Sequence, residues 1–296
     1  MATVEQLKNN LIQNTENKVS KEGPINIKNL LNQENVKKKF LEVLGSKTPS
    51  YLASVVSLAT VNLKDVEPMS IAASALVSAT LDLPINPSLG FAYLVPFKEK
   101  QANGQFIKKA QFQLGYKGFI QLALRSGQYK NINVIEIYEG QLEEWNPLVE
   151  EIKFNFKEKL SDKVIGYASY FKLINGFEKT VYWSIEDVEN HAKKFSKTYN
   201  SKYGVWKTNF DAMAKKTVLK NMLSKWGILS IEMQTALRTD QAVVDKDVFD
   251  KTEIEDIDLK YSDNNDFIDV VDVQLEEESN IEQEQINLLE DESLNE

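Results

Sequence analysis

The hydrophobic positions in the first part of the chain recur with helical spacing. Those of residues 35–44 lie on one face of a helix, and Gly45 follows, a residue that favours the position just after a helix end. A Thr-Pro pair and a Glu-Pro pair are typical helix starts, because proline is tolerated in the first turn. They predict two further helices, at 48–61 and 67–81. The second of these is rich in Ala and Ser, so a neighbouring helix or subunit can approach it closely.

From Phe91 onward the pattern changes to the alternation of β-strands. Residues 91–97 and 106–114 flank Asn103-Gly104, a dipeptide that favours a tight turn, so they predict a β-hairpin. Pro96 has no backbone N–H, so the first strand is expected either to lie at the edge of its sheet or to end early. Further strands are expected, the last two joined by a two-residue turn at Asn175-Gly176: 131–138, 152–156, 164–174 and 177–183.

Helical patterns separate and follow these strands. One helix begins with the capping sequence Ser184-Ile-Glu-Asp187, and the longest is a single helix from Trp206 to Trp226. The predicted ranges are 116–126, 184–195, 206–226 and 231–238. Helices combined with antiparallel hairpins in this order predict an α+β fold, in which helices pack around a small antiparallel sheet.

The distribution of charge divides the chain into three parts. The 296 residues carry a net charge of −9, but residues 240–296 alone hold 21 Asp or Glu and 3 Lys, a net charge of −18. Residues 1–239 keep 32 basic and 23 acidic side chains, a net charge of +9. We therefore expect an N-terminal arm at 1–33 that contacts a neighbouring subunit, a core at 34–239 that binds a polyanion, and a largely disordered acidic tail at 240–296.

Composition excludes several kinds of chemistry. The chain has no cysteine, which rules out disulfides and thiolate nucleophiles, and its one histidine, His191, is expected on the surface of a charged helix. No Walker-type phosphate loop is present, and the acidic pairs are adjacent in sequence, unlike the convergent carboxylates of a two-metal nuclease. We expect no cofactor and no metal. No apolar run is long enough to cross a membrane and residues 1–20 are polar, so an intracellular protein is expected.

Basic, polar and aromatic residues concentrate in two windows, 91–130 and 197–220. Proteins that hold single-stranded nucleic acid combine a cationic groove with aromatic side chains on which bases stack. Each lysine taken alone fits a solvated surface charge and each aromatic residue fits the core, so it is their concentration that carries the argument. Within the first window, Gly115-Tyr-Lys-Gly118 lets either a strand and a helix or a phosphate backbone approach closely.

Two sequence motifs occur in and around these windows. The first contains Asn86-Pro87, Gly90, Tyr93-Leu-Val-Pro-Phe97, Phe112-Gln-Leu-Gly-Tyr-Lys-Gly118, Leu122-Ala and Arg125-Ser-Gly127. The second contains Trp206-Lys-Thr-Asn-Phe210 and Met213-Ala-Lys-Lys-Thr-Val218. Together, over about 35–235, they resemble the RecT family of phage and prophage single-strand annealing proteins. Leu124 departs from the family, which often has two consecutive basic residues at this point, and this weakens a basic contact at 124 but not at Arg125.

The resemblance implies a Red beta/RecT-like core that binds single-stranded DNA without ATP, assembles into rings or helical filaments and pairs complementary strands, with no catalytic residue. We hypothesise that cations neutralise phosphates in a groove between the long helix and the unit formed by the first hairpin and the helix after it. Glutamines would touch the backbone, and aromatic side chains would stack on bases. The arm and the helix at 67–81 would form part of the subunit interface. The expected DNA-binding residues are Tyr93, Lys98, Lys109, Gln111, Gln113, Lys117, Arg125, Tyr203, Trp206, Lys207, Lys215, Lys216 and Lys220.

The partners implied are single-stranded DNA, the annealed duplex intermediate, further copies of the chain and a 5′→3′ exonuclease, in the cytoplasm of a bacterial host. Two acidic-apolar stretches of the tail, 266–273 and 286–294, have a composition that often becomes ordered on a partner, for which a host single-strand-binding protein is one candidate. Three alternatives stay open: a protein that only coats single strands, a metal-dependent nuclease, and a scaffold whose basic body binds its own acidic tail.

Overall fold

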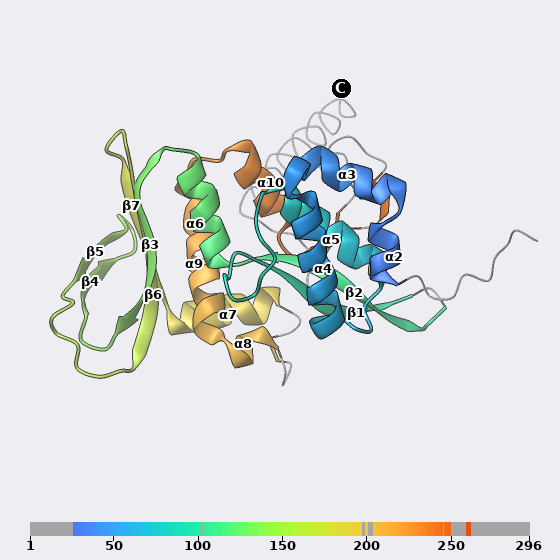
Figure 1. Ribbon diagram of the computed structural model, residues 1–296. Coiled ribbons are helices and arrows are strands. Elements are labelled where there is room, and N and C mark those ends of the chain that lie inside the picture. Colours follow the sequence, from blue (N-terminus) through green and yellow to red (C-terminus); the bar gives the residue numbers. More distant parts are fainter. Residues whose placement is uncertain are drawn as a thin grey trace, which may run out of the picture.

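The computed structural model describes residues 26–101, 103–196, 199–200, 204–244, 246–249 and 259–261, and its fold is α+β, as predicted (Figure 1). The helices are α2 (Ile27–Leu31), α3 (Glu34–Leu44), α4 (Thr48–Asn62), α5 (Pro68–Thr80), α6 (Tyr116–Arg125), α7 (Ile185–Phe195), α8 (Val205–Thr208), α9 (Phe210–Trp226) and α10 (Ile231–Thr239). The strands are β1 (Ala92–Lys100), β2 (Phe106–Leu114), β3 (Tyr129–Tyr138), β4 (Leu142–Asn146), β5 (Glu151–Phe154), β6 (Val164–Leu173), β7 (Glu178–Ser184), β8 (Ala242–Val243) and β9 (Lys260–Tyr261).

Helix α5 forms the centre of the helical part of the core, because its small side chains let other elements approach it closely. Its residues from Ser70 to Ala79 are all buried, and α2, α3, α4, β1 and β2 pack against it. The expectation that this helix contributes to a subunit interface is therefore wrong. Leu30 and Leu31 of α2 are also buried in this cluster, so the described end of the expected arm belongs to the core. Residues 1–25 lie outside the described residues.

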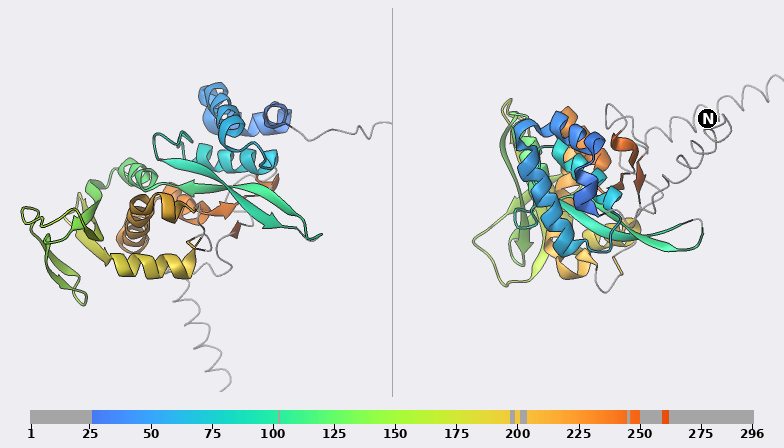
Figure 2. Two further views of the ribbon diagram at one scale, coloured as in Figure 1. Left: turned by 90° about the horizontal axis from the view of Figure 1, so that it is seen from below. Right: turned by 45° about the vertical axis from the view of Figure 1, so that its right-hand side comes forward.

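Strands β1 and β2 form an antiparallel ribbon that extends beyond the helices (Figure 2). Pro96 lies opposite Ala110, whose backbone groups turn away from β1. The Ala110 N–H donates to the Ser70 hydroxyl at 2.8 Å, and its carbonyl accepts from the Ser74 hydroxyl at 3.2 Å. The proline therefore costs no ladder hydrogen bond, and its predicted place at an outer edge is confirmed.

The segment that follows α10 runs along the outer edge of β2. The Asp240 carboxylate accepts the N–H of Leu114 at 2.8 Å, and the Gln241 N–H donates to the carbonyl of Phe112 at 2.9 Å. Strand β8 is buried and pairs with β9, and Val248 is buried as well. The expectation of a disordered tail from residue 240 is therefore wrong for this segment, whereas 250–258 and 262–296 lie outside the described residues.

Strands β3, β6 and β7 form an antiparallel sheet in the order β3-β6-β7, and α9 packs on it together with α6 and α7. The predicted β6–β7 hairpin is confirmed, but Leu173 and Phe177 still pair, so its loop has three residues and not two. Gly176, at φ 94°, takes the left-handed conformation that this loop requires. Strand β4, which the sequence pattern missed, pairs with β5, and Trp145 packs edge-on against Tyr182.

The helix expected from Trp206 to Trp226 is divided at Asn209, whose φ of −151° and ψ of 59° are not helical. Trp206 lies on α8, where its ring packs against Tyr199 and Phe210 with centroids 5.9 and 5.6 Å apart. The break lets Trp206 enter the core. The other predicted helices are confirmed to within a few residues, including the capping box at the start of α7. Within the described ranges, no helix is long and apolar enough to cross a membrane.

Candidate nucleic-acid interface

The lysines expected to bind DNA from the long helix are held by carboxylates of the same chain. Lys215 Nζ lies 2.6 Å from the Glu136 carboxylate on β3. Lys216 Nζ and Lys220 Nζ lie 2.7 and 3.5 Å from the two carboxylate oxygens of Asp240. These contacts turn all three side chains toward neighbouring elements, so the groove expected between the hairpin and the long helix does not form from them.

Asp240 is fully buried at the centre of this cluster. Burial by itself would raise the pKa of its carboxyl, but the attraction of Lys216 and Lys220 and the N–H of Leu114 outweigh it and hold the pKa below its usual range. The carboxylate is therefore ionised at neutral pH. This one carboxylate links α9, β2 and the segment after α10, so its role is structural.

His191 is half-buried between two aromatic rings and not on the surface as expected. Its ring centroid lies 5.2 Å from Trp183 and 4.6 Å from Phe195. Burial, together with the nearby charges of Lys220 and Lys194, lowers its pKa to about 4. The neutral ring packs in an apolar contact at pH 7, and this arrangement resembles a core position more than a catalytic one.

Four more of the predicted residues hold the fold together. Arg125 donates from its guanidinium to the carbonyls of Leu81 and Asp82, at 2.6 and 2.8 Å, and so fixes the chain after α5. Gln111 is buried and donates to the carbonyl of Gln241, while Gln113 donates to Gln111 at 3.0 Å. Trp206 is buried, as described above. The side chains of Gln111 and Trp206 are therefore taken up by the interior, whereas Arg125 remains exposed and Gln113 half-buried.

The remaining predicted residues lie on or near the surface. Lys109 is largely covered and pairs with Glu99 at 2.8 Å. Lys98, Lys117 and Lys207 are exposed, and Tyr93 is half-buried. The Lys207 ammonium lies 5.5 Å from the ring centroid of Tyr199. Tyr203 lies outside the described residues.

Two adjoining grooves run beside α4, with volumes of about 530 and 330 Å³. Val61 and Asn62 line both of them. The first lies between the outer face of α4 and the loop at 85–87, and the second reaches the base of the β1–β2 ribbon. We call their combined lining the α4 surface. Its polar members are Ser50, Ser54, Ser57, Asn62, Lys64, Asp65, Asn86, Lys98 and Lys108.

Lys117 and Tyr93 continue the α4 surface past the loop that ends at Gly90. A Cβ atom at Gly90 would lie 3.3 Å from the Lys117 side chain and 3.2 Å from the Tyr93 hydroxyl, so both rest against this loop. Of the predicted set, Tyr93 and Lys117 therefore lie together beside this loop, and Lys98 lies in the second groove. Within the described part of the chain, no carboxylate forms an ion pair with Lys64, Lys98 or Lys117.

The glycines of Gly115-Tyr-Lys-Gly118 allow a close approach within the chain. A Cβ at Gly115 would lie 2.2 Å from the carbonyl oxygen of Gly90, and one at Gly118 would lie 2.3 Å from that of Phe91. Packing of strand against helix, one of the two readings of these glycines, is therefore confirmed.

The sequence predicted the helix α4 but not that its outer face lines a groove, and Lys64 was not among the expected DNA-binding residues. The available signal was weak: Ser50, Ser54 and Ser57 recur with helical spacing on the face of α4 away from the core.

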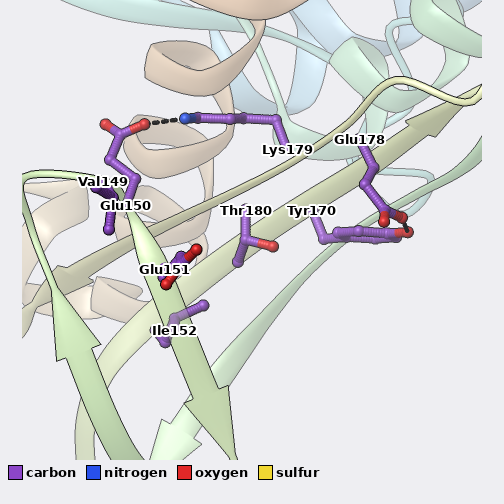
Figure 3. Close-up of a pocket in the computed structure, with 8 residues that line it drawn as sticks. All are labelled: Val149, Glu150, Glu151, Ile152, Tyr170, Glu178, Lys179 and Thr180. Carbon is purple, nitrogen blue, oxygen red and sulfur yellow. Dashed lines mark hydrogen bonds and ion pairs between the residues drawn. The ribbon is translucent and has the colours of Figure 1, made fainter.

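A separate pocket lies between the β4–β5 hairpin and the strands β6 and β7 (Figure 3). Lys179 points toward Glu150 and pairs with it, and Glu178 accepts hydrogen bonds from Tyr170 at 2.6 Å and Lys172 at 3.0 Å. Glu151 adds a third carboxylate. Three carboxylates against the one lysine of the lining disfavour the binding of phosphate groups here. In the described residues, no group of His, Asp and Glu is arranged to hold a metal ion.

Comparison with known proteins supplies the family. The RecT family matches residues 49–256, which is more than half of the chain. The chain belongs to the RecT family. It is 53% identical over 239 residues to the uncharacterized protein YqaK of Bacillus subtilis (strain 168), covering 80% of each chain. It is 29% identical over 236 residues to protein RecT of Escherichia coli (strain K12), covering 71% of this chain and 78% of the relative.

Membership of the RecT family implies a role in single-strand annealing recombination, and proteins of this family are generally non-catalytic. The matched residues include α4, both motifs and the segment after α10 that pairs with β2. The RecT region thus extends past the charge boundary at residue 240, in agreement with the buried Asp240 and Val248.

Proposed function

We propose that this chain is an ATP-independent single-stranded DNA-binding protein that oligomerises on DNA and anneals complementary strands in phage-type homologous recombination. The observation that carries the proposal is the α4 surface: two adjoining grooves, formed in part by the loop of the first RecT-like motif, in which Lys64 and Lys98 have no carboxylate partner among the described residues. The exonuclease, the host single-strand-binding protein and the bacterial cytoplasm remain predictions that follow from the family.

The chemistry of the α4 surface fits a strand held by its backbone. Lys64 and Lys98 lie at one end and Lys117 at the other, where their ammonium groups can neutralise phosphates. The hydroxyls of Ser50, Ser54 and Ser57 and the side-chain amides of Asn62 and Asn86 can donate to phosphate and sugar oxygens, contacts that position a strand without reading its sequence. Base edges held away from such a groove stay open to a complementary strand, which is the requirement for annealing.

The test compares two triple variants that remove the same charge. Lys64→Ala, Lys98→Ala and Lys117→Ala change the α4 surface, whereas Lys37→Ala, Lys157→Ala and Lys163→Ala change exposed lysines elsewhere. Fluorescence anisotropy with single-stranded oligonucleotides, repeated over a series of salt concentrations, gives the affinity. Loss of three phosphate contacts reduces the slope of log K against log[salt] by about 2, equally for every sequence, and the matched control keeps the wild-type slope.

Annealing is measured separately with two complementary oligonucleotides that carry a fluorophore and a quencher, without ATP. Wild type and control pair them rapidly, and the α4 variant pairs them slowly. Equal affinity and rate in both triple variants would refute the α4 surface as the site. Strong binding without faster pairing would instead identify a protein that only coats strands, and cleavage of labelled DNA in magnesium would identify a nuclease.

A further inference from the structure

The end of the molecule where α6 and α9 terminate carries an apolar surface that no described element covers. It joins the end of α6, the β6–β7 turn and the connection from α9 to α10, which lie together along the upper edge of Figure 1. We call it the Trp226 patch, formed by Leu124, Ile174, Phe177, Trp226, Ile228 and Ile231. Ile231 is 71% exposed and Ile174 67% exposed. Exposed apolar side chains that gather in one patch commonly mark an interaction site.

Hydrogen bonds to neighbouring backbone and side chains hold the patch in a fixed shape. The N–H of Ile228 donates to the Tyr129 hydroxyl at 2.7 Å, and the N–H of Ile174 donates to the carbonyl of Gln128 at 2.9 Å. Gln128 and Tyr129 are consecutive, so the two sides of the patch are attached to the same point of the chain. The patch is therefore preorganised, and a partner would bind it without ordering it first.

Cationic side chains lie around this apolar surface. The Lys179 ammonium lies 4.3 Å from the ring centroid of Trp226, although it also pairs with Glu150, and the exposed Lys225 adjoins Trp226 on α9. Arg125 and Lys130 flank the same chain segment as Tyr129, and both are exposed. Two carboxylates also lie at this rim, Glu150 beside Lys179 and Glu232 beside Arg125, so Lys130 and Lys225 are its cations without a carboxylate partner among the described residues. An apolar surface with this rim fits an apolar segment that carries carboxylates.

Such a segment occurs in the chain itself, close to where the described structure ends. Residues 266–273, Asp-Phe-Ile-Asp-Val-Val-Asp-Val, combine five apolar residues with three aspartates. The last described residue, Tyr261, is anchored at the end of α10, where its hydroxyl donates to the Arg238 carbonyl at 2.5 Å. Helix α10 has nine residues and so a length of about 13 Å. The first residue of α10 is Ile231 of the patch. The five residues from Tyr261 to Asp266 can span about 17 Å when extended, which exceeds the length of the helix, so Asp266 can reach the patch.

We propose that residues 266–273 dock on the Trp226 patch of the same chain. Phe267, Val270 and Val271 supply the apolar contact, and the aspartates face Arg125, Lys130 and Lys225. This docking directs the aspartates to the cations of the patch and away from the lysines of the α4 surface. These residues would then not compete with DNA for the α4 surface.

The absence of cysteine gives a direct test in the full-length chain. Ile231→Cys combined with Val270→Cys places one thiol on the patch and one in the segment. Leu148→Cys combined with Val270→Cys is the matched control, because Leu148 is 90% exposed and lies outside the patch. Under oxidised glutathione, the first pair forms an intrachain disulfide about tenfold faster than the control, because docking raises the effective concentration of the thiols. Non-reducing electrophoresis and mass spectrometry measure the rates, and circular dichroism verifies folding.

Two further measurements separate docking from chance encounter. Phe267→Ser with Val271→Ser, added to the first cysteine pair, reduces its rate to that of the control, since the apolar contact is lost. Raising the salt concentration leaves the first pair faster than the control, because an apolar contact is not screened. Equal rates for the two cysteine pairs, or a disulfide that forms only between chains, would overturn the proposal.

Discussion

Replacement of Asp240 by Asn tests whether the buried ion cluster holds the segment after α10 to the core. The variant keeps the shape of the side chain and an oxygen that accepts the N–H of Leu114, which lies at 2.8 Å in the wild type. It removes the charge that neutralises Lys216, of which only 7% of the side chain is exposed. Removal of one partner from a buried pair generally costs about 3–5 kcal/mol, because the other charge is left uncompensated.

The geometry places the expected loss near the lower end of this range. Lys220 is more exposed than Lys216, with 17% of its side chain accessible, and lies 3.5 Å from Asp240. It can turn toward water when the carboxylate is lost, so the main cost comes from Lys216. We therefore expect Asp240→Asn to lower the free energy of unfolding by about 3 kcal/mol at pH 7.

The effect depends on pH in a direction that follows from the lowered pKa of Asp240. A carboxyl whose pKa is lower in the folded than in the unfolded state contributes stability above the unfolded pKa, about 3.9. That contribution is lost as the pH falls through the folded value. The difference between wild type and variant should therefore be largest near neutrality and become smaller at acid pH.

Urea unfolding followed by circular dichroism measures both quantities. Asp162→Asn is the matched control, since Asp162 forms an ion pair with Lys159 at 2.6 Å but is 96% exposed, and we expect no shift of its unfolding midpoint. Adding Lys216→Met to Asp240→Asn should restore part of the lost stability, because it removes the uncompensated charge. If Asp240→Asn unfolded at the same urea concentration as wild type at pH 7, the assigned cluster would not contribute to the fold.

Two further predictions concern residues that the sequence placed at the surface. His191→Phe should reduce the loss of stability that acid denaturation shows between pH 6.5 and pH 4. The pKa of His191 is about 4 in the folded chain and 6.5 in the unfolded chain, so in this range the unfolded chain binds the additional proton. An unchanged pH profile would contradict the burial of this ring. Arg125→Ala should lower the melting temperature measured by calorimetry, because it removes two hydrogen bonds to the chain after α5. The salt dependence of DNA binding should stay that of wild type. A smaller salt slope without loss of stability would instead assign Arg125 to the DNA.

Local patterns determined most of the secondary structure. The ribbon of β1 and β2, the capping box of α7 and the glycine at the end of α3 all depend on residues within a few positions of one another. Such contacts are present in the sequence itself, so these elements were predicted closely. The family was visible for the same reason, because its motifs are contiguous runs. The break at Asn209 was missed, since it depends on Trp206 packing into the core and not on helix propensity.

Tertiary structure decided which charged and polar residues face outward. A lysine on a helix is either solvated or paired, and its partner lies at a distance in sequence that no local pattern shows. Lys216 reaches Asp240 across 24 positions, Arg125 reaches Leu81 across 44, and Gln111 reaches Gln241 across 130. The sequence therefore determined the family, the elements and the excess of positive charge before residue 240. Only the folded chain showed which lysines form ion pairs and which, such as Lys64, Lys98 and Lys117, have no carboxylate partner among the described residues. Burial and pairing are set by contacts between distant segments.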